Sequence, residues 1–166
     1  HKGIDVLINA INEVNKRGFN VKLVLIGDYQ RIKTKDRHVM DLLNSAGDNI
    51  LFTGFLSNDK LYDIVSQSLA LVLPTHYEGF GIPPLESLYL GGNAIITDLP
   101  VLREVYGGLP VTFFKDGDIK ALADLLLLKP QLNIDVMQTR QYIDSHYSFD
   151  IVVAKIIQVI ENEQIC

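Results

Sequence analysis

The chain has 166 residues, 48% of them hydrophobic and 21% charged, which is ordinary for a globular domain with one core. The formal net charge of -5 argues against nucleic acid as the main partner, because a phosphate backbone requires a basic surface. The single cysteine, Cys166, excludes a disulfide within the chain, and no apolar run approaches the roughly 20 residues that span a bilayer. We therefore expect a cytoplasmic domain.

The first half of the chain alternates between helical and extended patterns. Apolar residues recur at helical spacing from Ile4 to Val14, and Gly18 ends that run. The next apolar run, 21–26, is nearly continuous and predicts a buried strand. In chain order, the pattern then predicts a helix at 34–46, a strand at 50–53, a helix after the N-cap Ser57 and a strand at 69–73.

The second half continues this alternation after a loop at 75–82. The expected elements are a helix from Pro83, a strand at 94–97, a short helix at 100–106, a strand at 111–114 and helices at 119–128, 134–146 and 149–163. The last helix, with Ser148 placed to cap it, carries an apolar stripe that we interpret as a core face. This stripe consists of Val152, Val153, Ile156, Ile157 and Ile160.

Strands that alternate with helices predict an α/β fold, here a Rossmann-like three-layer sandwich around a parallel sheet of five to six strands. The pattern shows no linker, so residues 1–166 are expected to form one domain. Ligands of such sheets bind beyond the carboxyl ends of the strands. The loops after residues 26, 53, 73 and 97 are therefore the places to search, and the fold alone does not define a function.

The loop after residue 73 has an unusual composition. Gly79 and Gly81 allow a ligand to approach the backbone, and a helix that begins at Pro83 directs the positive end of its dipole toward the same place. Glu78 and Glu86 flank this turn, and carboxylates bind sugar hydroxyls well. The residues therefore suggest a ligand with both hydroxyls and phosphate. A structural interpretation stays open, because a carboxylate in a first helical turn is also favoured by the helix dipole.

The segment EGFGIPPLE, residues 78–86, resembles the Glu-x7-Glu signature of the retaining GT-B glycosyltransferases of the group 1 type. Its two prolines make it similar to the mannosyltransferase-like branch that builds surface polysaccharides. The resemblance extends over nearly the whole chain. It includes Lys2-Gly3 and the segments LIGD (25–28), FTGFL (52–56) and LPVLREV (99–105). The implied fold is the C-terminal, nucleotide-sugar-binding lobe of a GT-B enzyme.

The resemblance implies two catalytic residues. Lys2 would neutralise the diphosphate and stabilise the leaving group, and Glu78 would hold hydroxyls of the donor sugar. It also implies a set of donor-binding residues, with Glu86 on the ribose, the turn at 54–56 against the nucleobase and the loop amides on the sugar and diphosphate. This set consists of Gly54, Phe55, Leu56, Gly79, Phe80, Gly81, Ile82 and Glu86.

The implied donor is a GDP- or UDP-sugar, and the paired prolines favour mannose on guanosine diphosphate. No tightly bound cofactor is implied, and no His/Cys cluster has metal-ligand spacing.

The acceptor, a glycan or a lipid-linked sugar, would bind an N-terminal domain outside this sequence, so we expect residues 1–166 to be inactive alone. With that domain, the protein could also associate with the inner face of the membrane. Tyr29 replaces a glycine of the family's first turn and weakens the case for phosphate there.

Other interpretations stay open. The chain could be a binding module that holds a nucleotide or nucleotide-sugar without chemistry, or a relative of the GT-B epimerases and phosphorylases. An upstream lobe of similar size would favour the enzyme over the module. His76 is the other histidine considered for the site, with a surface-loop role as its default, and Asp98 is interpreted as a turn residue.

Overall fold

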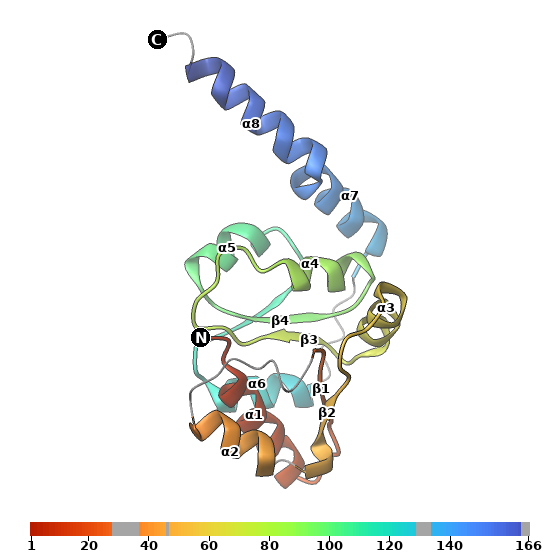
Figure 1. Cartoon of the computed structure of the whole chain (residues 1–166), viewed down its shortest axis with the longest axis vertical. Coiled ribbons are helices and arrows are strands. Elements are labelled where there is room, and N and C mark those ends of the chain that lie inside the picture. Colours follow the sequence, from red (N-terminus) through yellow and green to blue (C-terminus); the bar gives the residue numbers. More distant parts are fainter. Residues whose placement is uncertain (28–36, 46, 129–133, 164–166) are drawn as a thin grey trace.

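The computed structural model describes residues 1–27, 37–45, 47–128 and 134–163. Tyr29 and the first part of the helix predicted at 34–46 lie outside these ranges. The described helices are α1 (Ile4–Lys16), α2 (Arg37–Ser45), α3 (Asn58–Gln67), α4 (Ile82–Tyr89), α5 (Pro100–Tyr106), α6 (Ile119–Leu127), α7 (Val136–Tyr147) and α8 (Phe149–Glu163), with a 3-10 turn, η2, at Gly47–Asn49 (Figure 1). The described strands are β1 (Leu23–Leu25), β2 (Ile50–Phe52), β3 (Leu71–Leu73), β4 (Ala94–Thr97) and β5 (Thr112–Phe114).

The predicted α/β class is confirmed, and every strand ladder in the described part of the chain is parallel. The strands form two sheets, however, with the orders β1-β2 and β3-β4-β5, where one sheet was expected. A cavity of about 490 Å3 lies between β1 and β3 and is lined mainly by apolar side chains of both strands, α1 and α3. In the described part of the chain, this cavity separates the two sheets.

The helix α1 and the strand β4 form the centre of the core. The inner face of α1 is buried against α6, and all four residues of β4 are buried. A second buried cluster joins α4, α5 and α7 on the other side of β4. The two clusters therefore cover the two faces of the β3-β4-β5 sheet, as a three-layer fold requires.

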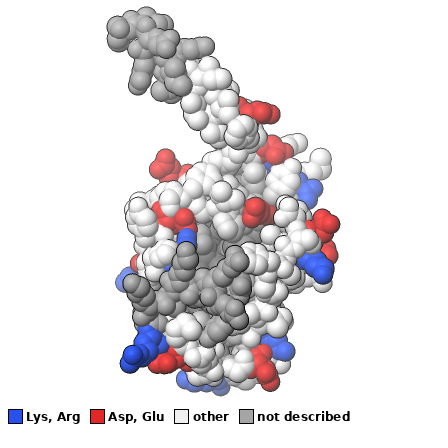
Figure 2. Space-filling view, viewed as in Figure 1, with Lys and Arg blue, Asp and Glu red and all other residues white. Residues whose placement is uncertain are grey.

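The helix α8 extends away from the rest of the molecule (Figure 1). The expectation of a core face was wrong for the described part of the stripe, because Val152, Ile156 and Ile157 are 43%, 53% and 49% exposed. The side chain of Ile160 lies outside the described residues. This helix packs on α7 across the turn at Ser148, whose hydroxyl accepts a hydrogen bond from the Ile151 N–H at 3.5 Å, as the predicted cap requires. On the face that Figure 2 shows, most of its described surface lacks charged side chains.

Candidate functional site

The loop between β3 and α4 begins at the carboxyl end of a parallel strand. Its last residue, Gly81, caps α4 with a φ of 79°, a conformation that favours glycine. A Cβ at Gly81 would lie 3.1 Å from side-chain carbons of both Leu73 and Leu102, so the close packing of this turn also favours glycine. Pro83 and Pro84 lie in the first turn of α4 as predicted, because their missing N–H groups need no partner there.

Lys2 and Glu78 meet at this loop, although 76 positions separate them in the chain. The Lys2 Nζ donates to the Glu78 Oε2 at 2.9 Å, and the Gly79 N–H donates to the Glu78 Oε1 at 3.0 Å. The bond from Lys2 holds the pKa of the Glu78 carboxyl below its ordinary value, the Gly79 and Phe80 N–H groups act in the same direction, and burial opposes them. Glu78 is therefore an anion at neutral pH, with a cation beside it.

A close backbone approach brings Lys2 to the loop. Gly3 has a φ of 62°, and a Cβ at this position would lie 1.8 Å from the Pro74 carbonyl oxygen. Only glycine fits there without a shift of the backbone. The structure therefore explains the Lys2-Gly3 pair, in which the glycine allows the contact and the lysine supplies the charge.

Glu86 is exposed on α4 and faces two hollows in the surface. It lines the 490 Å3 cavity between the sheets and a second pocket of about 350 Å3 that α3, α4 and α7 enclose. The other residues that line both hollows are Tyr62 and Leu90. Glu86 can therefore accept hydrogen bonds from a ligand in either hollow.

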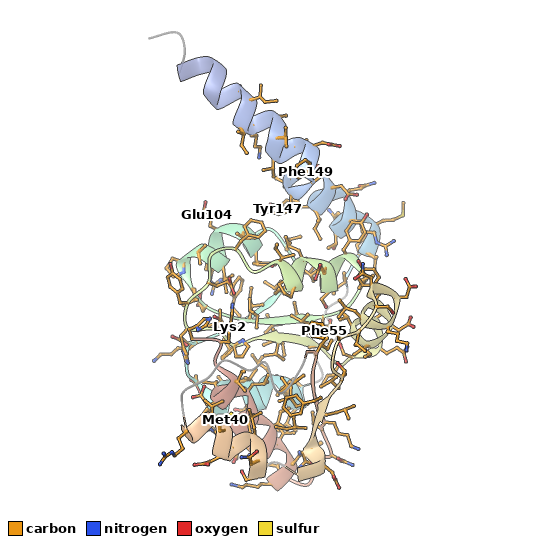
Figure 3. All side chains as sticks on the ribbon, in the orientation of Figure 1. Lys2, Met40, Phe55, Glu104, Tyr147 and Phe149 are labelled. Carbon is orange, nitrogen blue, oxygen red and sulfur yellow. The ribbon has the colours of Figure 1, made fainter. Side chains whose placement is uncertain are left out.

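The remaining predicted residues lie in two places. Phe80 packs edge-on against Tyr147, with ring centroids 5.6 Å apart, and Ile82 is exposed at the start of α4. The turn at 54–56 follows β2, where the Gly54 carbonyl accepts from the Gly27 N–H at 3.2 Å. Phe55 is exposed and lies well apart from Lys2 in the view of Figure 3. The structure therefore brings Lys2 together with 78–79, and it separates them from the turn at 54–56.

Two buried residues that the sequence did not indicate as site residues, Thr75 and Tyr106, make hydrogen bonds to the backbone of this loop. Thr75 is fully buried, and its hydroxyl contacts the backbone of both His1 and Tyr77. Tyr106 of α5 is also fully buried and donates its hydroxyl to the Gly81 carbonyl. Burial raises the pKa of the Tyr106 phenol, which keeps the donor protonated. A polar residue two positions after an apolar strand was the available signal for Thr75.

The two polar residues considered beside the motif have protein partners. The His76 Nδ1 lies 2.6 Å from the Asp116 Oδ1, which ties the loop to the segment after β5. Asp98 accepts two hydrogen bonds from Arg103, at 2.6 and 2.8 Å.

Across the described ranges, no group of three or more His, Cys, Asp or Glu side chains is arranged to hold a metal ion. No helix in those ranges is both long and apolar enough to cross a membrane.

In the described structure, a parallel α/β domain carries a cation–carboxylate pair at a glycine-capped helix start beyond the carboxyl end of β3, the edge where ligands of such sheets bind. The chain belongs to the family of glycosyl transferases group 1, whose sequence profile matches residues 1–132. The family membership expected from the motif and its flanking segments is thereby confirmed.

Two curated relatives are named as mannosyltransferases. The serotype-specific mannosyltransferase WbdA of Escherichia coli is 38% identical over 109 residues, which are 64% of this chain and 13% of the relative. The O-antigen chain mannosyltransferase RfbU of Salmonella typhimurium is 28% identical over 152 residues, which are 90% of this chain and 41% of the relative. The chain therefore spans less than half the length of either relative.

Solved structures show the same fold at low sequence identity. Sucrose-phosphate synthase from Thermosynechococcus elongatus superposes with a TM-score of 0.73 at 21% identity, covering 97% of this chain and 42% of that one. The pneumococcal O-GlcNAc transferase GtfA, solved in complex with UDP and GlcNAc, superposes with a TM-score of 0.69 at 20% identity, covering 96% and 33%. The α/β fold predicted from the sequence is thereby confirmed for nearly the whole chain.

Proposed function

We propose that this chain is the donor-binding half of a retaining glycosyltransferase that moves a hexose, with mannose favoured, from a nucleotide diphosphate sugar. The observation that carries the proposal is the Lys2–Glu78 pair at the start of α4. A diphosphate needs a cation and helix-start N–H groups, and a sugar needs a carboxylate that accepts from its hydroxyls. All three features meet at one short loop, to which Lys2 comes from a distant part of the chain.

In this proposal Lys2 moves from Glu78 toward the diphosphate when the donor binds. Its ammonium then stabilises the negative charge that develops on the departing nucleoside diphosphate. Glu78 keeps its charge and accepts hydrogen bonds from hydroxyls of the donor sugar. The amides of 79–82 add neutral donors around the same anion, and the glycines leave room for it.

Glu86 takes the ribose in this proposal, and the turn at 54–56 takes the base. Glu86 is exposed and lies on the wall of both hollows, so its carboxylate is open to a diol. The nucleobase, the sugar and the retention of configuration rest on the motif resemblance together with the two named mannosyltransferases. A GDP-sugar is our preferred donor and a UDP-sugar the alternative.

The acceptor is proposed to be a glycan or a lipid-linked sugar that binds a second lobe. Because the chain spans 13% to 41% of these relatives, we propose that transfer requires the remainder of the protein and that residues 1–166 are inactive alone. We place the protein in the cytoplasm or at the inner face of the membrane. Sugar transfer by residues 1–166 alone would contradict the need for a second lobe.

The test is calorimetric titration of the full-length protein with GDP-mannose, UDP-glucose, UDP-N-acetylglucosamine and ADP-glucose. We expect one nucleotide class to bind, and Glu86→Ala to weaken that binding by roughly tenfold or more, because two hydrogen bonds to a carboxylate are lost. Glu104→Ala is the matched control, since Glu104 is also an exposed helical carboxylate, on α5, and lines neither of the two hollows.

Each outcome has a distinct meaning. Binding that Glu86→Ala weakens and Glu104→Ala leaves unchanged supports a donor site on α4. Binding that neither substitution changes would place the nucleotide elsewhere. Binding without turnover in the presence of any acceptor would favour the non-catalytic module, and no binding at millimolar concentration across the panel would overturn the proposal.

A further inference from the structure

The buried hydroxyl of Thr75 joins two segments that are far apart in the chain. Its Oγ1 lies 2.9 Å from the carbonyl oxygen of His1 and 2.7 Å from the carbonyl oxygen of Tyr77. A threonine hydroxyl has one proton, and it is the only donor that Thr75 offers to these two acceptors from its side chain. His1 directly precedes Lys2, and Tyr77 directly precedes Glu78. Thr75 therefore connects the backbones immediately before the two members of the ion pair.

Two other contacts hold the same junction. The His76 N–H donates to the His1 carbonyl oxygen at 2.9 Å, so this oxygen receives two hydrogen bonds. On the other side of Lys2, the backbone of Gly3 lies against the Pro74 carbonyl so closely that no side chain fits between them. The backbone of Lys2 is thus held against the loop from both sides, while its side chain is half exposed.

The Lys2–Glu78 ion pair by itself contributes little to fixing the position of the Lys2 ammonium group. Its lysine side chain is 52% exposed, and an exposed pair on a long flexible stem is only weakly stabilising because water screens the charges. The position of the ammonium group therefore depends on where the backbone of Lys2 is fixed. A hydrogen bond made inside the protein, away from water, is better suited to fix it.

We propose that Thr75 is a positioning residue, whose buried hydroxyl sets the separation of the Lys2 and Glu78 backbones so that both side chains reach one donor molecule. This inference rests on the function proposed above, because it assigns Lys2 and Glu78 to the donor. Thr75 itself is fully buried, so we assign it no contact with the donor.

The test compares Thr75→Val, which keeps the shape and removes the hydroxyl, with Thr75→Ser, which keeps the hydroxyl. Thr97→Val is the matched control: Thr97 is equally buried, and its hydroxyl donates to a backbone carbonyl, that of Leu73, at 3.2 Å. Two readouts are taken on the full-length protein. The first is the titration of the Glu78 carboxyl by 13C NMR, assigned as the signal that Glu78→Gln removes. The second is kcat and KM for nucleotide release from GDP-mannose and UDP-N-acetylglucosamine.

We expect Thr75→Val to raise the pKa of Glu78 toward its ordinary value, because the Lys2 bond that lowers it becomes intermittent. We expect kcat to fall by roughly tenfold to a hundredfold, with KM changed by less than about threefold, since misplacement of a charge affects the reacting state most. Thr75→Ser should restore both readouts. Thr97→Val should lower stability and leave both readouts unchanged.

Three results would overturn the proposal. One is a Glu78 titration and a kcat that Thr75→Val leaves unchanged. Another is a Thr97→Val protein that changes both readouts as strongly, which would reduce Thr75 to a general packing role. The third is a failure of Thr75→Ser to restore them. If Lys2→Met and Glu78→Gln leave nucleotide release unchanged, the proposed function fails instead, and the Glu78 titration still reports whether Thr75 holds the pair.

Discussion

The helices α1 and α8 both carry an apolar stripe, but the stripe of α1 is buried and that of α8 is largely exposed. Both carry apolar residues at helical spacing along one face. On α1 that face is buried against α6 and the sheet, with Ile8 only 1% exposed. On α8 the corresponding residues are about half exposed, and the helix extends from the domain beyond α7 (Figure 1).

The difference shows that an apolar stripe predicts a helix and the face that would pack, but not whether a partner is present. The apolar stripe of α1 is covered because α6, at 119–127, packs against it. Among the described residues, α8 contacts chiefly α7. Whether an apolar side chain is buried therefore depends on the elements that pack against it. Because buried apolar surface stabilises the fold, α1 should contribute more to the free energy of unfolding than α8.

The largest effect is expected for Ile8→Ala in α1. Removing a fully buried isoleucine loses its transfer free energy and leaves a cavity, so the free energy of unfolding should fall by roughly 2–5 kcal/mol. Urea denaturation followed by circular dichroism measures this change. A loss of less than about 1 kcal/mol would show that α1 is not the packed helix of this comparison.

An intermediate effect is expected for Tyr147→Phe at the junction of α7 and α8. The Tyr147 hydroxyl donates to the Val105 carbonyl oxygen at 2.7 Å, and its ring packs against Phe80. The substitution keeps the ring and leaves the carbonyl without this donor, so stability should fall by about 0.5–1.5 kcal/mol in the same assay. Tyr62→Phe, at an exposed position on α3, is the control and should be neutral. Equal values for the two variants would count against an anchored junction.

The smallest effect is expected for Ile156→Ala in α8. The side chain is 53% exposed, and alanine favours a helix, so the free energy of unfolding should change by no more than about 0.5 kcal/mol. Comparison with Ile8→Ala keeps the chemical change the same and varies only the burial. A loss above about 1.5 kcal/mol would mean that α8 is covered in solution and would remove the contrast with α1.

The candidate site shows the same division between local pattern and packing. The glycines and prolines around 79–84 predicted a helix start that a ligand can approach, because glycine permits backbone conformations that other residues avoid and proline fixes its own φ. Lys2 was assigned only through family resemblance, since nothing near it in the chain indicates Glu78. Thr75 and Tyr106 escaped notice because their partners are remote: 74 positions separate Thr75 from His1, and 25 separate Tyr106 from Gly81.

Local periodicity and turn chemistry were enough to predict the order of helices and strands, the α/β class and the loop that presents Glu78, because these depend on residues a few positions apart. Three features depended on the folded chain: the separation of β1-β2 from β3-β4-β5, the exposure of α8 and the junction of Lys2 with Glu78. Each arises from contacts between distant segments, or from the lack of a covering segment in the described structure. Contacts of this kind depend on how well the surfaces of separate elements pack together, which a short stretch of sequence does not determine.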